Sequence, residues 1–563
     1  MLNATVADGG EYRVDLDSGI TYAFEAIPSS FGWLRVSSTT ITRISTGLLG
    51  NETAQPAWDA QQFLIDAAST VGTDAATLAT YFSEFAATLS VDAARIQRGE
   101  KSVTELRNLD HAELESHMTG HSLLVANKGR LGFSASDVRR YAPESAQRVR
   151  LQWIAVHRGL AEFRGTSDLS EQDLLKRELG GETIDRFGSA LKAKGLEPEA
   201  YVWMPVHPWQ WDHVVQVVHA SDVAQHRIVL LGESLDAYLP GQSVRTMTNV
   251  DVPDRYDVKL PLKILNTLVW RGIPPHCTMG AAVVTEWLRT LLGNDPFLNG
   301  DCGTKFLGEV ASVTVRHPYL SKVEGIPYQH LETLGCIWRE SVSSRRDASE
   351  RVRTMASLLH TDGAGNAFVA ELVRSSGLVP QDWLYRFFRT LLEPLVYILY
   401  RYGLTFNPHG QNILIGYDDN DVPCRIYIKD FVDDVCVSHT HVSERAPEPD
   451  GYEHLLPRKH PSQIRQHVID AIFVGQFRYL SALCSEQLDV KERTFWGLVR
   501  EVILEVQGKF PELSDRFAEY DLLTSEIPRY ALNRDRLVVT GYIERPFRHA
   551  LYPNGSFRNP LSL

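Results

Sequence analysis

Residues that could bind a phosphorylated ligand occur in three separated segments of the chain. These segments, residues 120–130, 243–271 and 409–430, supply lysine and arginine charges, hydroxyl groups and an aspartate. Fixed cations and hydroxyl donors stabilise phosphate and carboxylate oxygens, and an aspartate can hold the metal ion that accompanies a nucleotide. The combination indicates a site that handles a polyphosphate together with a carboxylate, as an ATP-using ligase does.

The first segment, GHSLLVANKGR, is dense in groups that bind anions. If it curls between its glycines, His121, Lys128 and Arg130 reach one pocket. Gly129 and Gly132 would let backbone N–H groups approach the ligand. In the alternative interpretation, Lys128 and Arg130 are solvated surface charges and His121 is a packed loop histidine.

The second segment combines residue type with spacing. Ser243, Arg245 and Thr246 are expected in a strand, where Ser243 and Arg245 would face the same side. A hydroxyl and a guanidinium suit triphosphate oxygens, and Lys259 adds a further cation.

The second half of this segment is expected to be helical. Pro261 is typical of a first helical position, so a helix over residues 261–271 would place Thr267 and Arg271 one turn apart on one face. This pair could clamp a carboxylate. The alternative is an amphipathic helix that shows Lys263 and Arg271 to water.

The third segment, HGQNILIGYDDNDVPCRIYIKDF, partly resembles phosphotransfer enzymes of the kinase kind, in which a loop and a following strand deliver an aspartate to the nucleotide metal. Asp430 would hold Mg²⁺, and His409 and Asn412 would contact phosphate. A kinase also needs an aspartate within the loop to receive the substrate proton, whereas this chain has Gln411 in that neighbourhood. The pattern favours nucleotide binding without phosphoryl transfer to a hydroxyl.

Hydrophobic periodicity predicts the elements that must position these groups. Apolar residues recur at helical spacing over residues 57–98, and short β-rich runs dominate residues 120–315. Helices return after residue 316, with a β-hairpin between the first two. We expect helices over 383–402, closed by Gly403 in a left-handed cap, 461–484 and 493–510, and hairpin strands over 411–417 and 424–431.

Composition and charge argue against several classes of function. The 563 residues carry a formal net charge of -13 without a long basic run, which argues against a nucleic-acid partner. The six cysteines lack C-x-x-C spacing, which indicates reduced, mostly buried thiols rather than a zinc or redox site. No signal peptide and no run of 18 apolar residues is recognisable, so we expect no membrane association and a cytoplasmic protein.

Together the three segments resemble the NRPS-independent siderophore synthetases, the aerobactin-synthetase-like IucA/IucC family. Each motif is short, but the order and spacing of the motifs make coincidence improbable. The similarity spans residues 120–434 and includes PVHPWQW at 205–211, SVRT at 243–246, K-x11-R at 259–271 and HGQN at 409–412.

His207 lies within PVHPWQW. The prolines and tryptophans around it favour packing over catalysis for that histidine.

The resemblance implies a fold and a reaction. The fold would be α+β and hand-like, with a helical thumb over residues 1–119, a β-rich fingers domain over 120–315 that carries the ATP and carboxylate motifs, and a largely helical, kinase-like palm over 316–563. Such proteins are usually homodimers. With ATP and Mg²⁺, a carboxylic acid such as citrate or a citrate monoamide would become an acyl adenylate with release of pyrophosphate. An amine or hydroxyl substrate would then give an amide or ester and AMP.

Matching motifs also imply roles for single residues. Carboxylate attack on the α-phosphate brings two anions together, so fixed cations rather than a nucleophilic side chain would carry the chemistry. Arg271, His121, Thr267 and Lys259 would act on the carboxylate and the acyl adenylate. The nucleotide would be held by Ser243, Arg245, Thr246, Lys259, Lys128, Arg130, His409, Gln411 and Asn412, and the metal by Asp430 and Asn412.

Two positions depart from the family pattern. Leu124 stands at the second histidine of the usual GHPxHPxxK loop, and Asn407 stands where many members have glutamate. These departures give weight to one alternative, a nucleotide-binding scaffold without turnover. The other alternative is a kinase-like phosphotransferase, which would form ADP.

Overall fold

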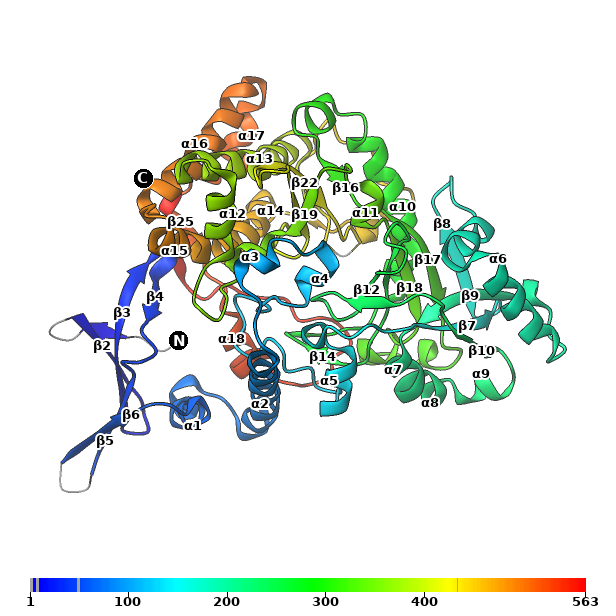
Figure 1. The fold of residues 1–563 in the computed structure, drawn as a ribbon, viewed down its shortest axis with the longest axis horizontal. Coiled ribbons are helices and arrows are strands. Elements are labelled where there is room, and N and C mark those ends of the chain that lie inside the picture. The colour runs from blue at the N-terminus through cyan, green and yellow to red at the C-terminus, as the bar shows by residue number, and fades with distance from the viewer. Residues whose placement is uncertain (1–3, 7–9, 48–50, 433, 563) are drawn as a thin grey trace.

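The computed structural model describes residues 4–6, 10–47, 51–432 and 434–562 as a mixed α and β fold (Figure 1). Its first part is an antiparallel sheet of short strands rich in β-branched and aromatic residues. The expectation of helix throughout residues 1–119 is therefore wrong before Ala60, where the first helix begins. The strands are β1 (Thr5–Val6), β2 (Glu11–Asp15), β3 (Ile20–Ser29), β4 (Trp33–Val36), β5 (Thr42–Thr46) and β6 (Glu52–Pro56).

Two longer helices follow, and they confirm the periodicity over residues 57–98. α1 (Ala60–Val71) begins after Asp59, whose carboxylate accepts hydrogen bonds from two backbone N–H groups, and ends at Gly72 in the left-handed conformation. α2 (Ala75–Arg98) comes next. Two short helices, α3 (Val103–Leu106) and α4 (His111–Glu115), then lead to the first motif.

The β-rich texture of residues 120–315 is confirmed by two packed sheets that share one hydrophobic core. One has the order β10-β7-β9, and the other has the order β11-β12-β13-β18-β17-β8. The first sheet contains β7 (Gln152–His157), β9 (Tyr201–Val206) and β10 (Ile228–Glu233). The second contains β8 (Ala161–Gly165), β11 (Tyr238–Pro240), β12 (Thr246–Asn249), β13 (Asp257–Lys259), β17 (Glu309–Val315) and β18 (Gly335–Arg339).

Helices cover these sheets and join them to the rest of the molecule. In Figure 1, α6 (Glu171–Lys192) lies at the far end of the sheets, and α10 (Pro275–Leu292) lies beside β17. The shorter helices of this part are α5 (Ala135–Tyr141), α7 (Pro208–Gln210), α8 (Gln216–Val218) and α9 (Ala220–Ala224).

His207 packs, as its neighbours predicted. It lies between β9 and α7, is 0% exposed, and accepts a hydrogen bond at Nδ1 from the backbone N–H of Trp209 at 3.1 Å. Burial lowers the pKa of its imidazole to about 3, so the ring is neutral.

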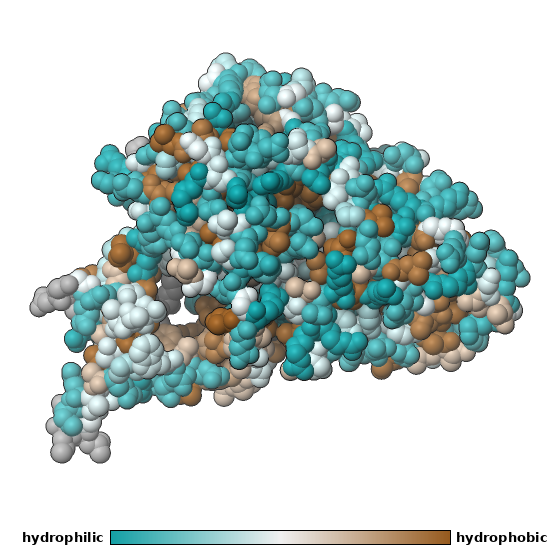
Figure 2. Space-filling model, viewed as in Figure 1, coloured by the Kyte–Doolittle hydropathy of each residue, from teal (hydrophilic) through white to brown (hydrophobic). Residues whose placement is uncertain are grey.

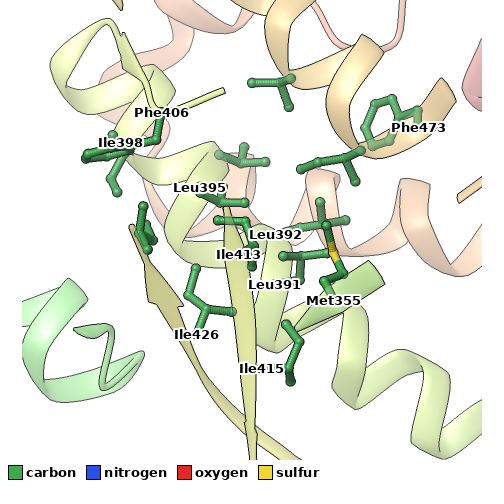
Figure 3. Close-up of a cluster of buried hydrophobic side chains, with 14 of the residues drawn as sticks. Met355, Leu391, Leu392, Leu395, Ile398, Phe406, Ile413, Ile415, Ile426 and Phe473 are labelled. Atoms are coloured by element: carbon green, nitrogen blue, oxygen red, sulfur yellow. The ribbon is translucent and has the colours of Figure 1, made fainter. Parts of the chain in front are cut away.

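The last part is largely helical, and its centre is α13 (Pro380–Tyr402), which ends at Gly403 in the left-handed conformation as predicted. Figure 3 shows Leu391, Leu392 and Leu395 of this helix against the predicted hairpin, β21 (Ile413–Tyr417) and β22 (Pro423–Ile428). This apolar packing fixes the hairpin that leads to Asp430. The other helices are α11 (Val342–Arg345), α12 (Phe368–Ser376), α14 (Pro461–Val468), α15 (Arg478–Gln487), α16 (Glu492–Lys509), α17 (Ser514–Glu519) and α18 (Leu532–Arg534).

The remaining strands are short and come from several parts of the chain. β22 and β21 belong to a sheet of order β16-β22-β21-β19. Its outer strands are β16 (Lys305–Phe306) and β19 (Arg351–Thr354). The remaining strands are β14 (Leu265–Asn266), β15 (Val269–Trp270), β20 (Leu404–Thr405), β23 (Cys436–Ser438), β24 (Arg458–Lys459), β25 (Glu526–Pro528) and β26 (Ser556–Arg558).

Surface and core agree with the composition. Figure 2 shows hydrophilic residues over most of one face, with hydrophobic ones in small groups. Among the described residues, only the continuous helix Pro461–Gln487 is long and apolar enough to cross a membrane by length and composition, and 67% of its apolar window is buried in the protein. Such burial is typical of a core helix. All six cysteines are free thiols, and four of them are buried.

Candidate active site

A cavity of about 290 Å³ lies where the second six-stranded sheet meets the HGQN loop and α4. The structure thus brings the second and third predicted segments together. The lining residues are His111, Glu115, Gly241, Ser243, Thr246, Thr248, Arg339, Gln411, Lys429 and Asp430.

Asp430 is the carboxylate at the centre of this site. Its Oδ1 accepts from Lys259 Nζ at 3.0 Å and from Arg339 Nη1 at 3.2 Å. Burial alone would raise the pKa of this carboxyl, but Lys259, Arg339 and Lys429 outweigh it and lower the pKa far below its usual value. Asp430 is therefore ionised at any physiological pH.

Lys259 lies between two carboxylates. Besides Asp430, Glu309 Oε1 lies 3.6 Å from its Nζ, and Glu309 is 0% exposed. Burial would lower the pKa of Lys259, but the two carboxylates raise it, so the ammonium stays charged. Burial and the nearby Asp430 raise the pKa of Glu309.

The segment around Ser243 is a turn, so the expectation of a strand at Ser243 and Arg245 is wrong. The backbone N–H of Gly241 donates to Thr246 O at 2.9 Å and closes a hairpin loop between β11 and β12, in which Val244 has a φ of 67°. A turn forms here because strand pairing begins only at Thr246, which pairs with Lys259. Ser243 and Thr246 nonetheless both line the cavity.

The predicted helix over residues 261–271 is also wrong, because a tight hairpin forms there. β14 and β15 pair around Thr267, which has a φ of 60°, and the apolar run from Ile264 to Trp270 suits strands better than a helix. The predicted meeting of two side chains still occurs, since Arg271 Nη2 donates to Thr267 Oγ1 at 2.6 Å.

Arg271 is an unusual buried cation. Burial, and then repulsion from Arg245, Arg130 and Arg548, lowers the pKa of its guanidinium to about 9. Its Nε is buried without a hydrogen-bond partner, and within the described part of the chain no carboxylate pairs with it. A guanidinium held in this way is suited to an anionic ligand.

Two neutral histidines face this region. Burial, then Arg271, lowers the pKa of His121 to about 4, and burial, then His121, lowers that of His409 to about 4. These interactions place the first segment beside the other two. His409 Nδ1 accepts from the backbone N–H of Gln411 at 3.2 Å and so shapes the HGQN loop.

Lys128 and Arg130 are engaged by the protein itself. Lys128 Nζ donates to Thr119 O at 2.6 Å and pairs with Asp92 at 3.1 Å, while Arg130 Nη2 pairs with Glu144 at 2.8 Å. Both side chains are 3% exposed or less, so they are not the solvated surface charges of the alternative interpretation.

Gly129 and Gly132 pack closely against other parts of the protein. A Cβ on Gly129 would lie 2.2 Å from the backbone oxygen of Glu84 in α2, and one on Gly132 would lie 3.1 Å from Ile264 Cγ2. Protein atoms already occupy the space that a side chain would take at these two glycines, so close packing requires glycine there, and the approach of their N–H groups to a ligand stays a prediction.

The two departures from the family pattern have structural accounts. Leu124 is 8% exposed and packs as an apolar residue. Asn407 has a φ of 50°, which asparagine tolerates, and donates to Asp434 Oδ1 at 2.9 Å. Asn412 donates to Asp434 Oδ2 at 3.1 Å, so one carboxylate holds both amides.

Several site residues escaped the sequence reasoning. Glu115 Oε2 accepts from the backbone N–H of Gln242 at 2.7 Å, and Glu115 Oε1 lies 3.9 Å from Lys429 Nζ and 3.7 Å from His111 Nε2. The spacing of His111 and Glu115 on one helix face was a usable signal. Arg339 bridges Asp430 and Asp257.

Family models match two parts of the chain. The IucA / IucC family model matches residues 110–360, and one described as ferric iron reductase FhuF-like transporter matches residues 381–543. In the described ranges, no group of three or more His, Cys, Asp or Glu residues is placed so that it could hold a metal ion.

Among solved structures, aerobactin synthetase IucC from Klebsiella pneumoniae superposes with a TM-score of 0.86 at 29% identity, over 100% of this chain and 94% of its own. The ATP-bound aerobactin synthetase IucA from the same organism shares the fold with a TM-score of 0.75 at 17% identity, over 100% of this chain and 96% of its own.

Sequence relatives extend over nearly the whole chain. Aerobactin synthase from Escherichia coli is 31% identical over 92% of this chain and 87% of its own length. Rhizobactin siderophore biosynthesis protein RhbF from Rhizobium meliloti is 36% identical over 98% of this chain and 91% of its own length. This chain therefore belongs to the IucA/IucC family of NRPS-independent siderophore synthetases.

Proposed function

We propose that this protein is an ATP- and Mg²⁺-dependent synthetase that joins citrate, or a citrate monoamide, to an amine during siderophore biosynthesis. The names of its relatives support the reaction class, since they include aerobactin synthase and putrebactin synthase from Shewanella, the latter 33% identical over 85% of this chain and 75% of its own length. The cytoplasm, where ATP is available, is the proposed location, and a homodimer is the proposed assembly.

The proposal rests mainly on the buried Arg271, which pairs with no carboxylate of the described residues and lies beside Thr267 and two neutral histidines. A guanidinium and a hydroxyl 2.6 Å apart can hold a substrate carboxylate in a fixed orientation. The cavity next to it offers Ser243, Thr246 and Lys429 to phosphate oxygens. A carboxylate and an α-phosphate could therefore meet among cations that the fold has already fixed.

Each group has a distinct task in this scheme. Arg271 and Thr267 orient the acid, and Lys259 and Arg339 offset the negative charge that develops on the phosphate. His121 and His409 stay neutral, so they do not repel the incoming amine. Nδ1 of each ring accepts a backbone N–H, so Nε2 carries the proton and can donate a hydrogen bond to a substrate or phosphate oxygen. No residue needs to form a covalent bond to the substrate.

The residues present fit a magnesium ion. Mg²⁺ bound with a nucleotide typically uses one or two carboxylates together with phosphate oxygens and water, so the absence of a three-ligand cluster among the described residues agrees with this mode. Asp430 would hold it, with the Asn412 amide oxygen nearby in the same loop system. The metal would neutralise phosphate charge.

Two other functions are less well supported. A kinase-like phosphotransferase would need a carboxylate in the HGQN loop to receive a substrate proton, and Gln411 lines the cavity at that place. A scaffold without turnover does not account for an ionised Asp430 surrounded by three cations.

The test is pyrophosphate release with ATP and Mg²⁺ across a panel of citrate, 2-oxoglutarate and succinylated diamines, with hydroxylamine as the nucleophile. We expect acid-dependent release of pyrophosphate and AMP. Arg271→Ala should reduce it by about 100-fold or more, because a buried anion partner is removed. Lys263→Ala is the matched control, since Lys263 Nζ faces His330 at 3.5 Å instead. Formation of ADP, or full activity of Arg271→Ala, would contradict the proposal.

A further inference from the structure

A second cavity, of about 210 Å³, lies where the end of α2 and the start of α3 meet the loop before α12. It shares no lining residue with the active-site cavity. Three permanent cations and two histidines line it, against a single carboxylate. The lining residues are Arg95, Arg98, Gly99, Glu100, Lys101, Leu106, His117 and His360.

Buried polar atoms in this cavity lack partners. Arg95 Nη2 pairs with Glu100 at 3.1 Å, but its Nη1 is buried and has no hydrogen-bond partner among the described residues. His360 is 2% exposed, and its Nδ1 is also buried without a hydrogen-bond partner among the described residues. An unmade hydrogen bond to a buried group is costly, so such atoms around a cavity are typical of a site that a ligand completes.

Positive charge dominates the lining of the cavity. Burial, then Arg98, Lys101 and Arg95, lowers the pKa of His117 to about 4, and burial, then Arg95 and His117, lowers that of His360 to about 4. Glu105 opposes the shift at His117, and Asp362 opposes the shift at His360. The other carboxylates near the cations are Asp92 and Glu100 beside Arg95 and Glu144 beside Arg98.

The walls of the cavity are held in place by bonds that do not use the cavity. Arg98 Nη1 donates to the backbone oxygen of Glu144, and the backbone N–H of Val103 donates to Asp362 Oδ2 at 3.1 Å. Ser102 and Glu105 form a reciprocal cap at the start of α3. The cations are therefore held together by α2, α3 and the loop before α12, which are fixed to one another and to the rest of the protein.

Helix polarity explains only part of this arrangement. Arg95 and Arg98 lie in the last turn of α2, where cations interact favourably with the helix dipole. That effect does not account for His117 and His360, which come from other elements and lose their charge in this field.

We propose that this cavity is a binding site for a small phosphate-like oxyanion, distinct from the nucleotide site. Guanidinium and ammonium donors match tetrahedral oxyanions. Two sources share this chemistry: free inorganic phosphate, and the pyrophosphate released by the reaction, the latter resting on the proposed function. An occupied site would tie α2 and α3 to the loop at His360.

The test is calorimetric titration of the full-length protein with phosphate, and separately with pyrophosphate, against chloride buffers of equal ionic strength. The double variant R98A/K101A should raise the dissociation constant by at least about tenfold, since two of the three cations are lost. The double variant K192A/K194A, at the exposed end of α6, removes the same charge and should bind like wild type. Tighter binding of one anion identifies the source.

Repeating both titrations with Lys259→Ala distinguishes binding in this cavity from binding at the nucleotide site. Anion binding in this cavity should persist in that variant. Sulfate, whose charge is constant between pH 5 and 8, should bind more tightly at the lower pH, because a bound anion raises the pKa of His117 and His360 and so takes up protons. Lys101→Glu replaces the double variant if that protein does not fold. Equal affinities in wild type and pocket variants, or loss of the signal in Lys259→Ala, would overturn the proposal. Because binding is measured without turnover, an inactive enzyme would not affect this result.

Discussion

The guanidinium of Arg536 donates a hydrogen bond to the backbone oxygen of Thr267, although 269 residues separate the two in sequence. Arg536 is 3% exposed, and its Nε lies 3.6 Å from Glu84 Oε2 in α2. Arg536 in the C-terminal segment thus anchors the hairpin that presents Thr267 to Arg271. Through Glu84, it also links this hairpin to α2.

Arg536 should therefore position the carboxylate clamp without touching substrate. We expect Arg536→Ala to raise the KM for the acid about tenfold while the KM for ATP changes little, because the Thr267 carbonyl loses its anchor. Arg536→Lys should recover part of the loss, since charge toward Glu84 remains. Steady-state kinetics with each substrate varied in turn gives the measurement.

The control for this change is Arg534→Ala in α18, two residues earlier, where the described contacts include no hydrogen bond to the Thr267 hairpin. A parallel fall in affinity for acid and ATP, or equal effects of both substitutions, would show that Arg536 supports the fold in general.

A buried carboxyl gives the protein a predictable pH dependence. Burial raises the pKa of Glu178 from 4.5 to about 7, and its Oε2 has no hydrogen-bond partner among the described residues. The folded protein then keeps a proton that the unfolded chain has lost, so this group lowers the free energy of unfolding as pH rises from about 4.5 to 7.

Glu178→Gln should remove that slope while keeping the bond from the Tyr256 N–H to the side-chain oxygen, which is 3.2 Å long. The thermal midpoint of wild type should fall between pH 5 and 8 by the equivalent of about 1–3 kcal/mol, and that of the variant should fall less. Glu182→Gln, an exposed position on the same helix, serves as control. An unchanged slope in Glu178→Gln would refute the assignment.

Lys128 has one role predicted from the sequence and a different one in the structure, and its substitution can distinguish them. As a nucleotide ligand its loss would raise the KM for ATP, whereas as the partner of Asp92 and Thr119 O its loss would lower stability. We expect Lys128→Met to lower the free energy of unfolding by about 1–3 kcal/mol with little change in the KM for ATP. A large rise in that KM at unchanged stability would restore the sequence-based role.

The sequence predicted which side chains meet better than it predicted the backbone that brings them together. Thr267 and Arg271 were expected on a helix and meet across a hairpin, because a spacing of four residues suits a helical turn and also a tight turn between paired strands. Residue type led to the correct contact, whereas the pairing of β14 with β15 and the bridge from Leu265 to Leu131 decided the backbone structure.

Other parts could not be predicted because their partners are far away in sequence. Glu115 takes its role from Gln242 and Lys429, and Arg536 takes its role from Thr267. By contrast, α13, its left-handed Gly403 and the β21–β22 hairpin follow from local periodicity and turn residues, and all three were predicted correctly.

Gly129 shows how such a distant contact can be tested. Its backbone passes so close to α2 that a Cβ would lie 2.2 Å from the backbone oxygen of Glu84, and a main-chain atom in a helix cannot move aside cheaply. Gly129→Ala should therefore lower the free energy of unfolding by about 2 kcal/mol or more. Gly497→Ala, in the exposed middle of α16 with no atom within 4 Å of the new Cβ, should instead stabilise by about 0.5–1 kcal/mol. Chemical denaturation of both variants measures the difference. If Gly129→Ala were as stable as wild type, α2 would not pack on this loop as described, and the link from Glu84 through Arg536 to the carboxylate clamp would fail with it.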